Sequence, residues 1–332
     1  MNKIVLNKDK ILEYQQNEPP YLMIDYAEEI IPGKSAKGYK DLKEDGLFST
    51  ISILRPNNYP DKPKPFFTSL TVSDYGIIEV NKVDGSFGDA IVSMSSAGMK
   101  NGLVIINPSE GEWVDDSQVK TLLQQAGLSN WEFIENDGVV IREKLIGVLN
   151  QIKPNDEDGF VVAVDQAFTV KGVGLVAIGH VQSGKVNKHD ELILAGSEGN
   201  AIARSLQVMD LDVEVANTGD RVGLAMRTAG SFREDLLGKG SILADSNERF
   251  VVESTSTFEL NKAAFQKNEL NAGDVVHLCS DLQFVVGRIR DISDYIQIDW
   301  DFPIVLNKSS QRNPLIVQLE ANPRIMGSAK FK

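Results

Sequence analysis

The tetrapeptide NKVD at residues 81–84 follows an apolar run and has the residue types that can recognise guanine. In an N-K-x-D motif the aspartate carboxylate, here Asp84, accepts hydrogen bonds from the ring NH and the exocyclic amine of the base. Asn81 and Lys82 would brace the loop. The same letters also occur in ordinary polar turns after apolar strands. The surrounding sequence must therefore decide between a guanine site and a turn.

A second candidate for nucleotide chemistry lies at residues 28–35, EEIIPGKS. Gly33, Lys34 and Ser35 match the end of the phosphate-binding pattern G-x-x-x-x-G-K-[ST], whose backbone NH groups wrap phosphates. Glu28 takes the place of the first glycine, and a second glutamate and two isoleucines follow it. Carboxylates repel a triphosphate, and β-branched residues poorly suit a nest of successive NH groups. We interpret this segment as a degenerate nucleotide loop.

Composition limits the other kinds of site. The 332 residues can form two or three domains, but a single cysteine, Cys279, excludes a disulfide within the chain. With only three histidines as well, we expect no metal site and no disulfide-linked partner. No apolar run is long enough for a membrane span, and the first 20 residues lack the apolar centre of a signal peptide, so we expect no membrane partner and a cytoplasmic location.

The charge balance bears on nucleic-acid partners. A formal net charge of −13 argues against a protein that binds bulk nucleic acid, and we expect no DNA partner. It does not exclude docking on RNA through a few local contacts. The last stretch is locally basic, and it contains Lys308, Arg312, Arg324, Lys330 and Lys332. This stretch is either a solvated C-terminal strand or an RNA contact.

The first 155 residues alternate between strand and helix patterns. Short apolar runs predict strands at 21–27, 47–54, 74–80, 102–107 and 131–135, and the last three suit strands covered on both faces. Helical patterns separate the later runs, at 87–98, 115–127 and 139–152. Because short connections between alternating strands and helices imply right-handed crossovers, we expect a parallel sheet in an α/β domain at 1–155.

A polar linker at 153–159, KPNDEDG, ends this pattern. Beyond it, strand-like runs are separated by glycine, asparagine, aspartate and serine at short intervals, as in closed antiparallel barrels. We expect one barrel at 156–246 and a second at 247–332. The predicted fold class is multidomain, α/β plus all-β: a parallel-sheet domain followed by two antiparallel β-barrels, in an open arrangement.

Specific segments of the first barrel carry a family resemblance. The glycine-rich segment FTVKGVGLVAIGHVQSGKVNKHDELILAG (168–196) precedes ANTGDRVGLAMR (216–227) and LLGKGSILA (236–244). This set resembles the second domain of translational GTPases of the EF-Tu class, in particular the archaeal selenocysteine-specific factor and archaeal EF-Tu-like proteins. The segment PRIMGSAKF (323–331) resembles the closing strand of that family's third domain. The resemblance implies a P-loop-GTPase-like first domain.

The resemblance also implies where further nucleotide motifs should lie. The family's D-x-P-G-H should end the strand at 47–54, where the sequence reads LRPNN and only Pro56 remains. The guanine motif should follow the strand at 102–107, where only Asn107 survives. NKVD follows the preceding strand, so we interpret it as a decoy. Without the phosphate loop, the magnesium aspartate and the catalytic histidine, we expect a pseudo-GTPase with no catalytic residues and no cofactor.

The family's second domain holds the aminoacyl end of tRNA in a pocket. Aligned on the G-D-x-V-G turn, the pocket positions fall at Gln207, Met209 and Arg221, where EF-Tu has Glu, His and Asn. A basic residue here resembles the selenocysteine-specific branch. Alternatively, Arg221 is a solvent-facing turn residue and Met209 fills the barrel.

Two functions remain open. The first is a non-catalytic elongation factor-like protein that docks on the ribosome or tRNA through its barrels, as a regulatory or hibernation-like factor. The second is a divergent but active factor that binds GTP and magnesium and delivers an aminoacyl-tRNA. Only the second requires a nucleotide.

Overall fold

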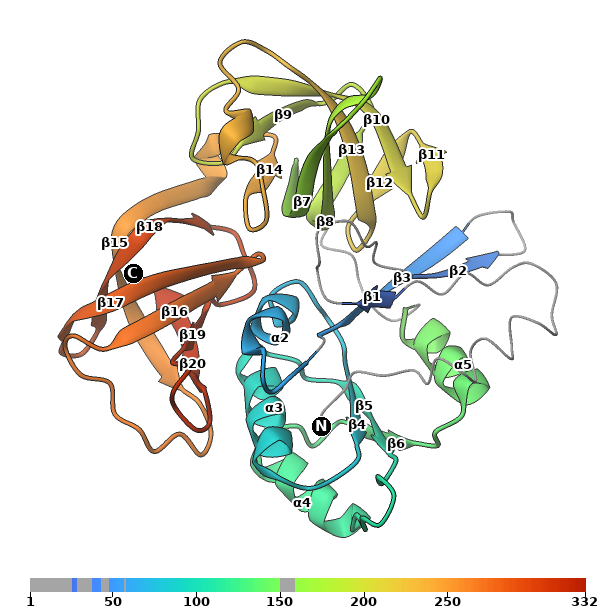
Figure 1. Ribbon diagram of the computed structural model, residues 1–332, viewed down its shortest axis with the longest axis vertical. Coiled ribbons are helices and arrows are strands. Elements are labelled where there is room, and N and C mark those ends of the chain that lie inside the picture. The colour runs from blue at the N-terminus through green and yellow to red at the C-terminus, as the bar shows by residue number, and fades with distance from the viewer. Residues whose placement is uncertain (1–25, 29–37, 43–47, 57, 150–158) are drawn as a thin grey trace.

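The computed structural model describes residues 26–28, 38–42, 48–56, 58–149 and 159–332. Figure 1 shows three parts: a helix-containing N-terminal part and two parts made of strands. The loop prediction at Gly33, Lys34 and Ser35 lies outside the described residues, and so does most of the predicted linker.

The N-terminal part contains a parallel sheet with helices packed beside it. Its strand order is β4-β5-β6, and both pairings are parallel. The strands and the helices that follow them are β4 (Gly76–Val80), α3 (Gly85–Ser96), β5 (Gly102–Ile106), α4 (Asp116–Gln125), β6 (Glu132–Ile134) and α5 (Gly138–Leu149). The predicted strand–helix alternation is confirmed. The prediction that the last strand is covered on both faces is wrong, because Phe133 of the edge strand β6 is exposed.

Before this sheet the described residues form three further strands and one helix. They are β1 (Tyr26–Glu28), β2 (Gly38–Leu42), β3 (Phe48–Arg55) and α2 (Pro63–Leu70). Strand β1 pairs with β3 in parallel, whereas β2 pairs with β3 in antiparallel fashion. Neither β2 nor α2 was predicted from the sequence. Helix α2 begins with a proline, which suits the first turn of a helix, and its buried face carries Phe66, Phe67 and Leu70.

The middle part is an antiparallel sheet that returns on itself, since β9 pairs with both β14 and β10. Its order is β11-β10-β13-β8-β7-β14-β9, and β12 pairs with β8. The strands are β7 (Phe160–Val170), β8 (Gly174–Asn187), β9 (Glu191–Leu194), β10 (Asn200–Val208), β11 (Leu211–Val213), β12 (Val215–Asn217), β13 (Arg221–Thr228) and β14 (Ile242–Ala244). Alternate residues of β7, namely Phe160, Val162 and Val164, point into its core.

The C-terminal part is a closed barrel of order β15-β18-β17-β16-β19-β20. Its strands are β15 (Phe250–Lys262), β16 (Val275–Ser280), β17 (Gln283–Ile292), β18 (Ile296–Asn307), β19 (Leu315–Val317) and β20 (Ile325–Phe331). The last strand lies within the segment at 323–331 that was predicted to close the domain, and it pairs with both β15 and β19. The predicted fold class is therefore confirmed. The boundary at 155/156 lies among residues outside the described ranges.

The expectation of an open arrangement is wrong. One hydrophobic cluster contains buried side chains from both the N-terminal part, such as Phe67 and Phe87, and the C-terminal barrel, such as Leu315 and Ile325. In Figure 1 helices α2 and α3 lie beside β16, β19 and β20. The sequence pattern does not predict this contact, because the pattern of each segment indicates only the core of its own part.

Candidate functional site

The carboxyl edge of the parallel sheet contains the NKVD segment. Asp84 is the N-cap of α3: its carboxylate accepts hydrogen bonds from the backbone NH groups of Ser86 at 2.9 Å and Phe87 at 3.0 Å. Such a bond satisfies an amide that the first turn of a helix leaves without a partner. Lys82 forms an ion pair of 2.8 Å with Glu112. The carboxylate and the ammonium of the motif are therefore both engaged within the chain.

The asparagines at this edge form a network around a buried carboxylate. Glu79, which is 7% exposed, accepts hydrogen bonds from the side-chain amides of Asn107 and Asn81. Asn81 also donates to the carbonyl of Asn107 at 2.7 Å. These bonds join the ends of β4 and β5. The structure thus places NKVD after β4 and Asn107 after β5, which is the strand order predicted from the sequence.

The resemblance assigns the family's magnesium aspartate to the position of Leu54, near the end of β3. Its side chain packs against a cluster made of Val72, Ala163 and Leu282, which come from the three parts of the molecule. A leucine provides no oxygen ligand for magnesium. Pro56, the one residue that matches the family's D-x-P-G-H motif here, is buried. At this described position the residues do not fit a magnesium–nucleotide site.

The three residues predicted from the resemblance line one pocket on the outside of the middle barrel. Gln207 lies on β10, Met209 in the turn that follows, and Arg221 at the start of β13. The pocket has a volume of about 400 Å³, and Ser52 of β3 is among the residues that line it. Its apolar wall consists of Phe168, Val170, Val173, Val176 and Ile178. The pocket therefore combines an apolar wall with a polar end.

Arg221 is oriented by a buried carboxylate. One of its terminal nitrogens lies 3.4 Å from Oδ2 of Asp165, and the two side chains are 11% and 3% exposed. Arg221 is thus not a solvent-facing turn residue. Asp165 lies at a register shift of β7. Burial raises the pKa of Asp165, and the charges of Arg221 and Lys239 oppose this shift.

His180 lies beside this ion pair. It is the direct cross-strand neighbour of Arg221, it is 5% exposed, and its Nε2 has no hydrogen-bond partner among the described residues. Burial lowers the pKa of His180 to about 3, with further lowering by Arg221 and Arg312. The imidazole is therefore neutral at physiological pH.

The other predicted pocket residues have mixed roles. Gln207 donates a hydrogen bond of 2.9 Å to Asp212, across the β10–β11 pair. Met209 has a φ of 53° and also packs against the core of the barrel, so it fills the barrel and lines the pocket. Arg204 and Asp210, which also line the pocket, were missed by the sequence analysis.

Asp165 was also missed, although the sequence contained a signal for it. It is the only charged residue in the run FVVAVDQAF, which is otherwise almost entirely apolar. A carboxylate in a buried strand requires a partner with a positive charge. This requirement points to a pairing of Asp165 with an arginine of the same barrel.

The described residues provide no alternative metal centre. None of their histidine, cysteine, aspartate and glutamate side chains form a group of three or more that could hold a metal ion. Within the same residues, no helix has the length and apolar character needed to cross a membrane.

Comparison with known proteins gives related chains and folds. An uncharacterized protein of Methanocaldococcus jannaschii is 30% identical over 244 residues, which are 73% of this chain and 75% of that protein. The selenocysteine-specific elongation factor of Escherichia coli is 33% identical over 220 residues, or 60% of this chain. The aligned region is about a third, 34%, of the Escherichia coli factor. No protein-family profile matches the chain.

Solved structures show the same fold. The apo form of translation elongation factor SelB from Methanococcus maripaludis superposes with a TM-score of 0.74, at 18% identity over 98% of this chain and 75% of that one. The same factor in complex with a GTP analogue gives a TM-score of 0.72 at 19% identity, over 90% of this chain and 73% of that one. With these relatives and this fold, the chain belongs to the EF-Tu-like translational GTPase family and is related to the selenocysteine-specific elongation factors.

Proposed function

We propose that this protein is a non-catalytic elongation factor-like protein that docks on the ribosome or tRNA through its barrels in the cytoplasm, as a regulatory or hibernation-like factor. The observation that carries this proposal is the pocket on the middle barrel. Gln207 near the end of β10, Met209 just after it and Arg221 at the start of β13 line this pocket, and its size suits a small group at the end of a larger partner. A guanidinium held by a buried carboxylate supplies a fixed donor for such a group.

The absence of GTP hydrolysis is supported by the residues at the sheet edge. Phosphoryl transfer depends on positioned cations that neutralise the developing charge. Leu54 stands where the family has its magnesium ligand, and Glu79 places a carboxylate among the asparagines at the strand ends. Glu28 and its neighbour add further negative charge to the predicted phosphate loop. These residues together disfavour a bound triphosphate.

A second function is favoured by the retained architecture. The apo form of SelB superposes over 98% of this chain, and the same factor in complex with a GTP analogue superposes over 90% of it. A factor that binds GTP and magnesium and delivers an aminoacyl-tRNA would use the same pocket. The two functions differ in their need for nucleotide.

The docking proposal is tested by co-sedimentation with ribosomes and by filter binding of aminoacylated and free tRNA. Arg221→Ala should reduce the retained complex at least about tenfold, since a charged hydrogen bond contributes about 1.5–3 kcal/mol. Arg227→Ala is the matched control, because Arg227 lies on the same strand β13 but not in the pocket. No association of the wild-type chain with either RNA would contradict the proposal.

These experiments require the full chain. Removal of residues 1–155 would uncover Cys279, Leu315 and Ile325, which pack in one cluster with the N-terminal helices. Exposed apolar surface of this kind promotes aggregation, and a loss of binding would then be uninformative. Point variants keep the shared core intact.

A further inference from the structure

On one side of the C-terminal barrel, side chains that point outward are buried. In β19 the middle residue Ile316 belongs to the barrel interior, whereas Leu315 and Val317 on the opposite face belong to the cluster shared with the N-terminal helices. These two outward side chains are 1% and 0% exposed. Successive residues of a strand point to opposite faces, so the outward pair is buried only because the N-terminal part covers it.

The same alternation occurs in two neighbouring strands. In β20 Met326 points into the barrel, and Ile325 points toward the N-terminal part with no exposed surface. In β16 Leu278 points inward, while Cys279 points outward and is also 0% exposed. Three adjacent strands, β16, β19 and β20, thus form an apolar face on the outside of the barrel.

Aromatic side chains of the N-terminal part cover this face. Phe66 and Phe67 of α2 and Phe87 of α3 are in the same cluster, and each is at most 2% exposed. Lys64 of α2 also lies 5.2 Å above the ring of Phe284 on β17. The contact is therefore packed like a domain core rather than like a hydrated domain boundary.

A buried carboxylate fixes the position of the two parts within this contact. Asp89 of α3, which is 4% exposed, accepts a hydrogen bond of 2.5 Å from the hydroxyl of Tyr59. It also accepts bonds from the backbone NH of Arg324 at 2.8 Å and from the guanidinium of Arg324 at 3.2 Å. Separation of the parts would leave a buried charge without its partner.

A second arginine joins all three parts. The guanidinium of Arg312 donates to the carbonyl of Thr71 at 2.9 Å and to the side-chain carbonyl of Gln182 at 2.8 Å, and it pairs with Asp74. Thr71 and Asp74 are in the N-terminal part, and Gln182 is on β8 of the middle barrel. Arg312 and Arg324, two of the basic residues near the C-terminus, thus join separate parts of the molecule.

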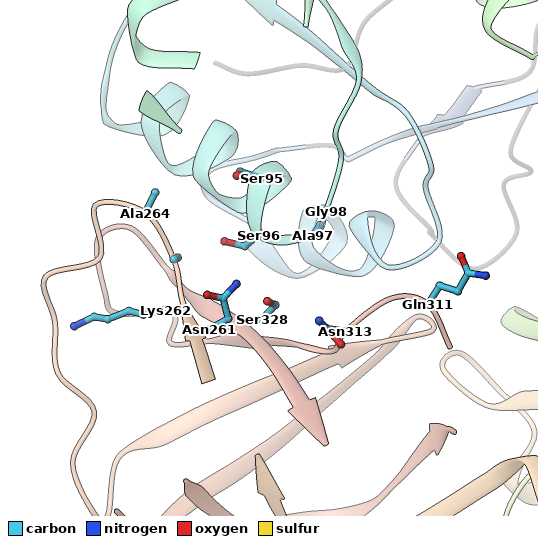
Figure 2. A pocket seen from close by; sticks show the side chains of 11 residues that line it. Ser95, Ser96, Ala97, Gly98, Asn261, Lys262, Ala264, Gln311, Asn313 and Ser328 are labelled. Carbon is cyan, nitrogen blue, oxygen red and sulfur yellow. The ribbon is translucent and has the colours of Figure 1, made fainter. Parts of the chain in front are cut away.

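The contact ends at a polar notch of about 290 Å³. Figure 2 shows Ser95 and Ser96, at the end of α3, facing Asn261 and Ser328 of the barrel across this notch. Most of the side chains that line it are small or uncharged, so we assign it no ligand. It marks where the apolar contact gives way to solvent.

We propose that the N-terminal part and the C-terminal barrel form one rigid body, whose arrangement is set by this apolar joint and by the Asp89–Arg324 pair and not by a bound nucleotide. This inference does not depend on the proposed function, since it holds whether or not the protein binds GTP. A protein with this fixed arrangement differs from a molecular switch, in which the domains move apart when the bound nucleotide changes.

Cys279 provides a native reporter of the joint, because it is the only cysteine of the chain and lies in the covered face. The full chain is treated with 5,5′-dithiobis(2-nitrobenzoate) at neutral pH, alone and with GDP or a non-hydrolysable GTP analogue plus magnesium. In the folded protein the thiol should react at least about a thousandfold more slowly than in guanidinium chloride, as expected of a site that opens only by large-scale unfolding. The nucleotides should change the rate less than about twofold.

Variants show whether the reporter responds to the joint. Arg324→Ala should raise the labelling rate at least about tenfold. Asp235→Ala, which removes an exposed ion pair with Arg233 outside the joint, should leave it unchanged. Circular dichroism checks that both variants are folded, and small-angle scattering of the wild type should give one radius of gyration with and without nucleotide. Rapid labelling of the folded wild type, or a nucleotide-dependent increase beyond twofold, would overturn the proposal.

Discussion

The side-chain amide of Asn107 donates a hydrogen bond to the carboxylate of Glu79, across the ends of β5 and β4. Asn107 is the one residue that matches the guanine motif where the family resemblance places it. Its amide is used to satisfy a buried carboxylate of the neighbouring strand. The edge of the sheet is therefore held together by the protein's own side chains.

Asn107→Ala should lower the free energy of unfolding by roughly 1–3 kcal/mol, because Glu79 would keep only the longer bond from Asn81 at 3.3 Å. Urea denaturation followed by circular dichroism measures this change. Ser109→Ala, in the exposed loop that follows, is the control and should stay close to wild type. Equal stabilities of the two variants would show that the carboxylate does not depend on Asn107.

Asp84→Ala should destabilise the protein by about 1 kcal/mol, since α3 loses its N-cap. Asp84→Ser keeps a capping oxygen and should recover most of that stability, although serine cannot bind guanine as a carboxylate does. Thermal unfolding of the two variants gives the comparison. If alanine and serine destabilise equally, the capping role assigned to Asp84 is wrong.

Much of this architecture follows from periodicity. The runs around Gly76–Val80 and Gly102–Ile106 are short, apolar and followed by helical patterns, which predicts a parallel sheet. Turn glycines at short intervals predict the barrels. Helix α2 was not predictable in this way, because it is only eight residues long and contains two prolines.

The joint between the first and third parts illustrates what pattern analysis missed. The three residues of β19, Leu315–Val317, are all apolar, and a strand with one solvated face alternates instead. That signal indicated burial on both faces but not the identity of the covering element. The pocket was predictable only through the family resemblance, since Gln207, Met209 and Arg221 share no spacing that implies a site.

Arg221→Ala should destabilise the fold by roughly 3 kcal/mol, because it leaves the buried Asp165 with a weaker set of partners. The double variant with Asp165→Asn should be more stable than Arg221→Ala alone, as the uncompensated carboxylate is removed. Urea denaturation of the wild type, the two single variants and the double variant gives the coupling energy. Additive effects would contradict the pairing.

The stability of the protein should fall as the pH decreases from about 6.5, because the pKa of His180 is lowered to about 3 in the fold. Below about pH 6.5 the histidine of the unfolded state takes up a proton that the folded state does not. The contribution of His180 to the free energy of unfolding is therefore complete above about pH 6.5 and is lost toward about pH 3. At pH 5 the loss should be roughly 2 kcal/mol. The raised pKa of Asp165 acts in the opposite direction, since the folded state binds that proton more tightly.

His180→Gln should flatten this pH dependence, whereas His189→Asn, at an exposed position, should keep it. Urea denaturation at several pH values from about 5 to about 7.5, on both sides of the ordinary histidine pKa, gives the slope of the free energy of unfolding against pH for each protein. Parallel slopes for the wild type and His180→Gln would contradict the assignment of this titration to His180.

The central claim, that this member of the family does not use GTP, is tested most directly by calorimetric titration of the full chain with GTP and with GDP in the presence of magnesium. The repulsion between a triphosphate and each nearby carboxylate is on the order of 1 kcal/mol even in water, and the leucine at position 54 cannot hold the magnesium that would offset it. We predict no binding heat at micromolar concentrations of protein and nucleotide. Stoichiometric, guanine-selective binding that Asp84→Asn shifts toward xanthine nucleotides would contradict both the decoy interpretation of NKVD and the pseudo-GTPase proposal.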